Sequence, residues 1–406
     1  MDILTVLNYQ GSKKNLLEFI HKSLSFYIDD NDIILDIFSG TASVAYSYKR
    51  TNTVYANDVE IYASTVAKAL LGNQLPQYVV EDIKSDYDAI ISTNTYQEWI
   101  YNEDLFVQEG NLDKLLQLYD EIPTVWKNGE KKFKDMPYSL FVKYYSTSYF
   151  GIRQARDIDA IRQAIDMSGD TNKDILLACL FFAMKECVFS KDGHMAQPLD
   201  LMKNSSKLLK LRKKSIIDTF IEKTFDFCKK DFVQNGKENK VFNCNFEELL
   251  NEKVIKDEVT VIYADPPYTD MQYSRYYHLL NTVVQYDYPD LTENARGYTK
   301  GLYLENRFQS QLSKKSTCLE SMEKLIRFSF EYNKVLAISF AYPQNIDKQK
   351  TDRYVMDIAD LIEVCKKYYP SNRVHVKKVK YEHSNNRNSE HKKVLEYLII
   401  CERDGK

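Results

Sequence analysis

The tetrapeptide Asp265-Pro266-Pro267-Tyr268 combines residue types that suit one kind of chemistry. It follows residues 259–264, a β-branched and aromatic run that predicts a buried strand, and the two prolines end that strand. The Asp265 carboxylate and the Pro266 carbonyl can accept both hydrogens of an exocyclic base amine, which localises the nitrogen lone pair for attack on an activated methyl group. Tyr268 offers a ring on which an unstacked base can lie. The motif therefore predicts methyl transfer driven by positioning, with a plain strand-terminating turn as the alternative.

Two earlier segments predict strands that end in acids. Residues 33–36 form a short apolar strand that ends at Asp36 and precedes a turn containing Gly40. Residues 54–57 form a second strand that is followed by Asp58, in a position that suits ribose hydroxyls. Open α/β sheets bind ligands at the carboxyl ends of their strands, and the absence of Gly-x-Gly-x-x-Gly disfavours NAD. Together the two segments favour an adenosine-type ligand, although each alone is an ordinary turn between a strand and a helix.

Composition limits the class of protein. The chain has 406 residues, 44% of them hydrophobic, which allows two domains or one domain with a large insertion. No apolar run is long enough to span a membrane, and no secretory signal is recognisable. Seven scattered cysteines without a Cys-x-x-Cys pair, and six histidines, predict a cytoplasmic protein without a metal site.

The charge pattern is uneven. A net charge of −3 argues against indiscriminate coating of nucleic acid, although a local basic face could still bind DNA. One basic cluster lies within residues 203–214 and includes Arg212, and another lies within residues 373–393. For each cluster the favoured interpretation is a solvated face.

Several motifs together give the chain a family resemblance. Tyr-x-Gly-Ser-Lys at residues 9–13, Asp-x-Phe-x-Gly at 36–40, Asn-Asp at 57–58 and Asp-Pro-Pro-Tyr at 265–268 resemble the Dam-like, alpha-order class of S-adenosylmethionine-dependent DNA adenine-N6 methyltransferases of bacterial restriction-modification systems. The resemblance implies that the methyl donor is held by the side chains or backbone of Tyr9, Gly11, Lys13, Asp36, Phe38, Gly40 and Asp58. By residue type alone, Gly11 to Lys13 is an anion-friendly loop before a helix predicted at residues 16–26.

Two positions depart from the family pattern. The family turn commonly has a second glycine where this chain has Ala42, which is tolerable if φ at that position is negative. A strand predicted at residues 241–246 commonly ends in an acid against the donor's adenine, and Asn245 takes that place here. The resemblance also implies DNA contacts by Gln272, Tyr273 and Tyr276, although Tyr276 suits simple packing equally well.

The resemblance and the element pattern predict an α/β fold. We expect a Rossmann-like methyltransferase sheet of about seven strands, the last antiparallel, formed by residues 1–72 and 240–406, with residues 73–239 as a mainly helical insertion that recognises the target. Helices are expected at residues 112–119, 136–145, 155–165, 175–189, 316–330 and 353–368. Arg153 and Arg156 in the insertion could contact DNA or carry solvated charges.

The predicted function is transfer of a methyl group from S-adenosylmethionine to adenine N6, after the base is flipped out of a specific double-stranded DNA sequence. A cognate restriction endonuclease is a possible partner, and an enzyme without one is the alternative. Cytosine-N4 methylation uses the same chemistry, and RNA is a further possible substrate. A non-catalytic DNA-binding subunit with the same fold is the alternative from another class.

Overall fold

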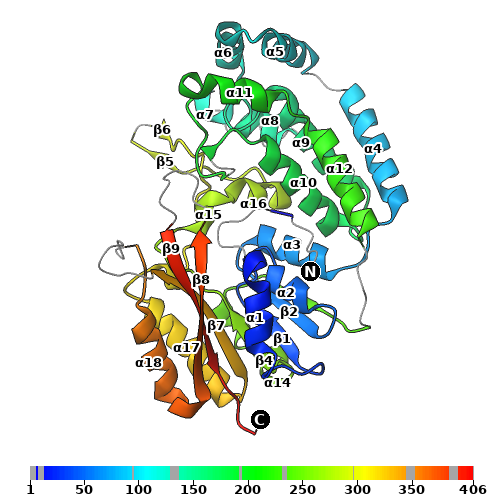
Figure 1. The fold of residues 1–406 in the computed structure, drawn as a ribbon. Helices are drawn as coiled ribbons and strands as arrows, with labels where there is room; N and C mark the ends of the chain where they lie inside the picture. Colours follow the sequence, from blue (N-terminus) through cyan, green and yellow to red (C-terminus); the bar gives the residue numbers. More distant parts are fainter. Residues whose placement is uncertain are drawn as a thin grey trace.

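The computed structural model describes residues 6–7, 13–93, 96–128, 137–191, 194–230, 236–295, 297–343, 353–383 and 392–405. Its chain forms a sheet with helices on both faces and a second, helical part above it (Figure 1). In the described part of the chain, no helix has both the length and the apolar character needed to cross a membrane.

The main sheet has seven strands in the order β3-β2-β1-β4-β7-β9-β8. The five strands from β3 to β7 in this order are parallel to one another, whereas β9 runs antiparallel to both β7 and β8. The strands are β1 Ile33–Asp36, β2 Thr53–Asn57, β3 Lys240–Phe242, β4 Val261–Ala264, β7 Val335–Pro343, β8 Val374–His383 and β9 Lys392–Cys401. This arrangement confirms the predicted fold class. A separate hairpin pairs β5 Glu293–Asn294 with β6 Gly297–Tyr298.

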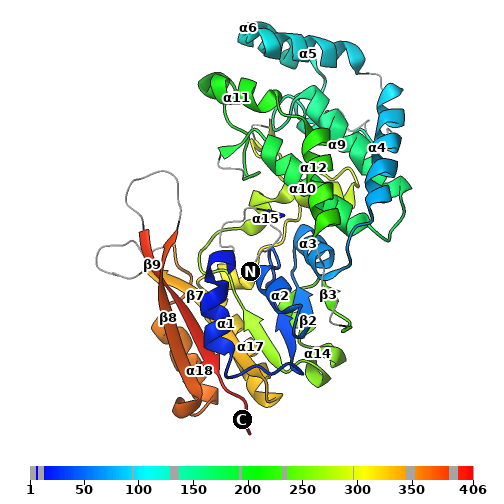
Figure 2. The same cartoon turned by 45° about the vertical axis from the view of Figure 1, so that its right-hand side comes forward.

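Alternate residues of the strands point to opposite faces of the sheet, and each face has its own core. Ile34 and Val261 face a cluster that includes α1 Leu17–Leu24, α2 Ser43–Tyr48 and α3 Ile61–Leu71. Leu35 and Ile262 face a cluster that includes α14 Lys253–Asp257, α17 Cys318–Glu331 and α18 Ile358–Tyr368. Figure 2 shows the two groups of helices on either side of the sheet. The central strands β1, β4 and β7 are therefore buried on both faces of the sheet, as is usual for parallel strands.

The helical part confirms the prediction that residues between Gly72 and Lys240 do not alternate strands with helices. Within the described residues of this segment, strand pairing is limited to isolated bridges. Its helices are α4 Gln77–Ser92, α5 Gln97–Glu109, α6 Leu112–Glu121, α7 Val125–Asn128, α8 Leu140–Tyr145, α9 Ile152–Met167, α10 Lys173–Cys187, α11 Ser205–Arg212 and α12 Ile216–Lys229. The core on the α3 side of the sheet continues without a break into α9, α10 and α12.

A later segment of the chain packs with these helices. α16 His278–Gln285 follows the tetrapeptide 265–268 in the chain, yet it packs with the helical part. The Arg162 Nε on α9 donates to the Val283 carbonyl at 2.8 Å, and the Tyr149 hydroxyl donates to the Gly301 carbonyl at 2.9 Å. The helical part is thus built from two segments of the chain, residues 73–239 and the segment around α16. The predicted insertion, residues 73–239, includes only the first of them.

Three predicted elements differ from the structure by four or five residues at one end, whereas the other predicted helices differ by three residues or fewer. The helix expected at residues 353–368 begins at Ile358, because Asp357 Oδ1 caps it by accepting from the Ala359 N–H at 2.7 Å. The helix expected at 136–145 begins at Leu140, and its expected first residue, Met136, lies outside the described residues. The strand expected at 241–246 ends at Phe242.

Candidate active site

A pocket with an empty volume of about 1120 Å³ lies at the carboxyl ends of β1, β2 and β4. This is where the strand order changes direction, since β1 leads outward to β2 and β3 while β4 leads to β7. The pocket brings together most of the predicted site residues. These are Lys13, Asp36, Phe38, Gly40, Asp58, Asn245, Asp265, Pro266, Pro267, Tyr268, Gln272 and Tyr273.

The tetrapeptide 265–268 leaves the end of β4 and forms one wall of the pocket. The ring of Tyr268 stacks on Tyr354 with a centroid separation of 6.3 Å, and its edge meets Phe340 at 6.1 Å. These contacts fix the plane of the Tyr268 ring, as a platform for a planar ligand requires.

Asp265 is held in a buried ion pair. Its Oδ1 lies 3.1 Å from the Nζ of Lys13, and the same Nζ lies 2.8 Å from the Oε1 of Glu396. Burial raises the pKa of Asp265 to about 7; Lys13 opposes this shift, whereas Glu396 adds to it. For Lys13, burial favours the neutral amine, but the two carboxylates outweigh it and raise the pKa of Lys13 above its usual value. The predicted contact of Lys13 with the donor stays a prediction, and the structure adds these two protein partners.

The turn after β1 is tied to the end of β2. The N–H of Gly40, whose φ is 49°, donates to Asp58 Oδ2 at 2.9 Å, and the N–H of Glu60 donates to Asp58 Oδ1 at 2.9 Å. A left-handed φ favours glycine, so Gly40 allows the backbone to close against the pocket. The carboxylate of Asp58 therefore organises two turns of the pocket wall as well as lining it.

Three further acids, Asp36, Asp58 and Glu60, line the pocket and form its acidic wall. Burial raises the pKa of Asp36 to about 8; the Ala45 N–H that donates to its Oδ2 at 3.1 Å lowers it, and the charges of Asp265 and Asp58 raise it further. Asp36 Oδ1 is buried without a hydrogen-bond partner among the described residues. Burial also raises the pKa of Glu60 to about 7. An unpaired buried acceptor and several crowded acids suit a cationic ligand.

Glu60 is a pocket residue that the sequence analysis did not single out. It is buried, and its Oε2 accepts from the Asn281 amide on α16 at 2.6 Å. The sequence signal was its position two residues after Asp58, where a second acid follows the end of the same strand.

Asn245, which the resemblance places against the donor's adenine, and Phe38, which it places in the donor pocket, both line the pocket. Asn245 lines the pocket, but it follows the end of β3 and caps the short helix α13 Phe246–Leu249 by accepting from the Glu247 N–H at 3.4 Å. The ring of Phe38 meets that of Phe246 with a centroid separation of 5.3 Å. This end of the pocket thus has aromatic walls and one amide.

The expectation for Ala42 is wrong, because its φ is 54° rather than negative. The residue is fully buried and precedes α2, so the turn forces an alanine into the left-handed region. For a residue with a side chain, that conformation costs roughly 1–2 kcal/mol.

We expect Ala42→Gly to stabilise the protein. Glycine removes the strain of the left-handed turn but adds backbone entropy to the unfolded chain, so the expected net gain is about 1 kcal/mol. Thermal unfolding with and without the donor checks this, and Ala45→Gly inside α2 is the control that should destabilise. A lower midpoint for Ala42→Gly would contradict the expected gain.

Three of the predicted site residues are not among the described residues that line the pocket. Tyr9 and Gly11 lie outside the described residues. Tyr276 is absent from the described pocket lining; its ring meets His194 at 5.1 Å, and its carbonyl accepts from the Met195 N–H at 2.8 Å. Gln272 and Tyr273 line the pocket.

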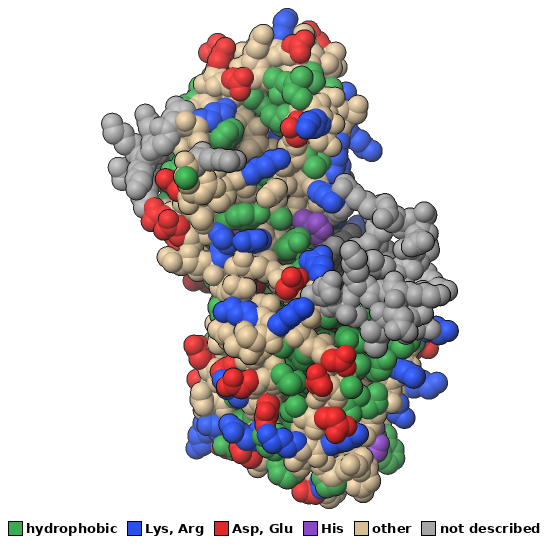
Figure 3. Space-filling model, turned by 90° about the vertical axis from the view of Figure 1, so that its left-hand side faces the viewer, with side chains coloured by type: hydrophobic (Ala, Val, Ile, Leu, Met, Phe, Trp, Pro, Cys, Tyr) green, Lys and Arg blue, Asp and Glu red, His purple; other side chains and the backbone are tan. Residues whose placement is uncertain are grey.

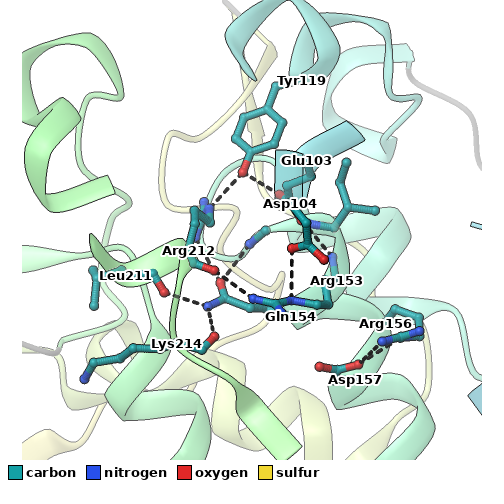
Figure 4. Close-up of polar contacts among 12 residues, drawn as sticks. Glu103, Asp104, Tyr119, Arg153, Gln154, Arg156, Asp157, Leu211, Arg212 and Lys214 are labelled. Carbon is teal, nitrogen blue, oxygen red and sulfur yellow. Dashed lines mark hydrogen bonds and ion pairs between the residues drawn. The ribbon is translucent and has the colours of Figure 1, made fainter. Parts of the chain in front are cut away.

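Arg153 and Arg156, which could have contacted DNA, are engaged inside the helical part (Figure 4). The Nη2 of Arg153 donates to the Arg212 carbonyl at 3.0 Å, and Arg156 pairs with Asp157 at 2.6 Å. Arg212 is 2% exposed, so the interpretation of the basic cluster at residues 203–214 as a solvated face is wrong for this residue. In the described part of the chain, no three His, Cys, Asp or Glu side chains form a group that could hold a metal ion.

Comparison with known proteins identifies the family. Residues 9–305 match the model of the D12 class of N6 adenine-specific DNA methyltransferases, and the chain belongs to this family. Within it, the chain is 25% identical to the modification methylase StsI of Streptococcus sanguinis over 404 residues, which are 98% of this chain and 52% of that protein. It is 24% identical to the modification methylase LlaI of Lactococcus lactis over 98% of this chain and 55% of that protein. It is also 23% identical to the type II methyltransferase M.NlaIII of Neisseria lactamica over 98% of this chain and 99% of that protein. The chain thus spans about half the length of StsI and LlaI and nearly all of M.NlaIII.

Proposed function

We propose that this chain transfers the methyl group of S-adenosylmethionine to N6 of an adenine that has been flipped out of double-stranded DNA. The observation that carries the proposal is the meeting of Asp265-Pro266-Pro267-Tyr268 with the acids Asp36, Asp58 and Glu60 in one pocket. One wall suits a base amine, and the other suits a cationic donor. Membership of the adenine-methyltransferase family supports the same assignment.

The residues on the acidic side bind and orient the donor, which supplies an electrophilic methyl group on a sulfonium. Asp36 and Glu60 face the positive charge, Asp58 accepts from the ribose hydroxyls, and Phe38 with Asn245 holds the adenine. The structure fits this ligand because Asp36 Oδ1 is a buried acceptor without a partner among the described residues.

The residues on the other side hold the target base. Asp265 accepts one N6 hydrogen, the Pro266 carbonyl accepts the second, and Tyr268 stacks on the ring. The nitrogen lone pair is then localised and directed at the methyl group, so positioning supplies most of the rate. The N6 proton leaves to solvent after transfer.

We further propose that the helical part recognises the DNA target, with α16 and the β5–β6 hairpin included. Lys and Arg side chains gather across the middle of the face in Figure 3, whereas its lower part mixes them with acids. Arg275 follows the pocket-lining Ser274, is exposed, and forms no ion pair with a carboxylate among the described residues. It therefore supports a phosphate contact at the pocket mouth.

All seven cysteines are free, which supports the cytoplasm as the compartment of this protein. A cognate restriction endonuclease is the proposed partner.

The test is transfer from labelled S-adenosylmethionine to unmethylated bacterial DNA, followed by digestion and mass analysis of the nucleosides. N6-methyladenine is the expected product. If N4-methylcytosine formed instead, the mechanism would stand but the target base would be cytosine. If only RNA became labelled, the substrate would be RNA and not DNA. Donor binding without any methylated product would favour a non-catalytic subunit.

The acidic wall predicts that binding of the donor is coupled to proton release. Asp36 and Glu60 have pKa values raised to about 8 and about 7, so at pH 6.5 both are largely neutral and at pH 8.5 both are more ionised. A sulfonium favours the ionised forms, hence preference for S-adenosylmethionine over the uncharged S-adenosylhomocysteine should rise about three- to tenfold over that range.

The two ligands carry the same amino group, so the ratio of their Kd values isolates the sulfonium. Calorimetric titration in two buffers of different ionisation enthalpy measures both the ratio and the protons released. Asp36→Asn should flatten the pH dependence. A ratio that stays constant with pH, with no proton release, would refute the coupling.

A further inference from the structure

Strand β9 carries a buried carboxylate that the reaction described above does not use. Glu396 is 1% exposed, and its partners in register are the apolar Ala341 on β7 and Val379 on β8. Its Oε1 accepts from the Lys13 Nζ at 2.8 Å and from the Ser339 hydroxyl at 2.5 Å. A buried charge costs several kcal/mol unless it is paired, so a residue of this kind inside a sheet calls for an explanation beyond packing.

Glu396 acts on the pocket through one side chain. It is absent from the described pocket lining, whereas Lys13 lines the pocket and is 6% exposed. The Lys13 ammonium lies between Glu396 and Asp265, 2.8 Å from one carboxylate and 3.1 Å from the other. The catalytic acid is thus connected to the terminal hairpin by a shared cation.

We propose that Glu396 is a positioning residue for methyl transfer: it holds the Lys13 ammonium between the two carboxylates, so that Asp265 keeps a cation nearby while it remains free to accept a hydrogen of the target amine. The proposal rests on the proposed function of the Asp265 motif. It assigns a role in the reaction to a residue that does not touch the substrates.

The electrostatic reason follows from two opposed requirements. Without a nearby cation, burial would keep Asp265 neutral, and a neutral carboxyl is a weaker acceptor. With Lys13 paired to Asp265 alone, the ammonium would occupy the carboxylate oxygen that the amine needs. Sharing the ammonium with Glu396 satisfies both requirements, and the hydroxyl of Ser339 fixes the Glu396 carboxylate in place by donating to its Oε1 at 2.5 Å.

The groups around Asp265 belong to several elements. The ionisable side chains that face it or interact with it are Lys13, Asp36, Tyr263, Tyr268, Tyr273 and Glu396. Burial raises the pKa of each of these tyrosines, so they remain neutral near pH 7. The local balance of Lys13, Asp265 and Glu396 is one cation against two carboxylates, and substitutions can change that balance in known steps.

The test compares four proteins by the pH dependence of single-turnover methyl transfer with donor and DNA saturating. Lys13→Met removes the cation, so the pH below which activity falls should rise by about one to two pH units. Glu396→Gln removes a negative charge, so that pH should fall by about one unit, while the plateau rate drops about tenfold because Lys13 then occupies Asp265. The double variant Lys13→Met/Glu396→Gln restores the wild-type charge balance. The pH below which its activity falls, here called the pH limit, should therefore lie between the pH limits of the two single variants.

A purely structural role for Glu396 predicts otherwise. It would lower the rate equally at every pH, and the losses of the two single variants would combine without any return in the double variant. Glu396→Asp, which keeps the charge, should keep the limit near its wild-type position, and it serves as the second variant if Glu396→Gln folds poorly. Glu402→Gln, which changes a carboxylate that contacts His375 at 3.1 Å, is the matched control in the same hairpin.

A measurement without substrates separates this proposal from the proposed function. Infrared titration of the protein alone follows the carbonyl band of protonated Asp265, identified by its loss in Asp265→Asn. The band should persist to higher pH in Lys13→Met and disappear at lower pH in Glu396→Gln. If the wild type methylates no DNA but the band moves in this way, the proposed function fails and the electrostatic assignment stands. An unmoved band in Glu396→Gln overturns the proposal.

Discussion

Replacing Asp265 with alanine should reduce the rate of methyl transfer by about 10²- to 10³-fold. The carboxylate is the proposed acceptor for one hydrogen of adenine N6, and without it the lone pair stays delocalised into the ring. Asp265→Asn should lose less activity, because the amide oxygen remains an acceptor in the same place. Single-turnover rates with labelled donor, together with mass analysis of the nucleosides, measure both effects.

The matched control is Asp270→Ala. Asp270 belongs to the same segment, but it is exposed, pairs with Arg353 at 3.4 Å and is absent from the described pocket lining. It should leave the rate within a factor of two to three of wild type. If Asp265→Ala keeps the rate within tenfold of wild type while binding the donor normally, positioning of the amine by this residue is not the source of catalysis.

The convergence of the acids could be predicted because each signal is local. Asp36, Asp58 and Asp265 each stand at the end of a predicted strand, and a glycine-containing turn follows Asp36 while two prolines follow Asp265. Parallel strands present their carboxyl ends at one edge of the sheet, so three separate local patterns imply one common place. The pocket lies at that edge and includes all three side chains.

Glu396 could not be found in this way. Its partner Lys13 is 383 residues away, and no local pattern records a pairing over that distance. In sequence, Glu396 is a single acid inside the apolar run of residues 394–401, and nothing in that run indicates a partner for it. The sheet buries it because β9 lies between β7 and β8. The burial of Arg212 was missed for a similar reason. Its partners Tyr119 and Ser148 are 93 and 64 residues away, and the neighbouring lysines indicated a solvated face.

The turn around Ala42 shows a different limit. From its residue type, Ala42 was expected to have a negative φ, whereas its φ in the structure is 54°. The ties between Gly40, Asp58 and Glu60 determine the path of this turn, and they come from β2 rather than from the turn itself. Tertiary constraints of this kind override the preference of a single residue at a moderate cost in free energy.

Arg212→Met should destabilise the helical part by about 3–5 kcal/mol. Arg212 Nε donates to the Tyr119 hydroxyl at 2.9 Å, and that hydroxyl donates to Glu103 Oε1 at 2.6 Å (Figure 4). Glu103 is 3% exposed and also accepts from the Ile152 N–H at 2.9 Å and the Arg153 N–H at 3.0 Å, at the start of α9. Removing the arginine leaves the Glu103 carboxylate buried without its positive neighbour, and its polar partners lose a donor.

Hydrogen exchange measured by mass spectrometry is the suitable readout, because a chain with two parts need not unfold in one step. Protection should fall in α5, α6 and the first turns of α9, while the strands around the pocket keep theirs. Arg153→Met is the matched control: Arg153 is 27% exposed and its pair with Asp104 at 3.4 Å is partly solvated, so the expected loss is below about 1 kcal/mol. If the two variants lost equal protection, the hydrogen bonds among Arg212, Tyr119 and Glu103 would not contribute more to stability than the partly exposed contacts of Arg153. If Arg212→Met instead weakened DNA binding at unchanged protection, Arg212 would have to be reached by the nucleic acid, which its burial among Tyr119, Gln154 and the Ser148 carbonyl opposes.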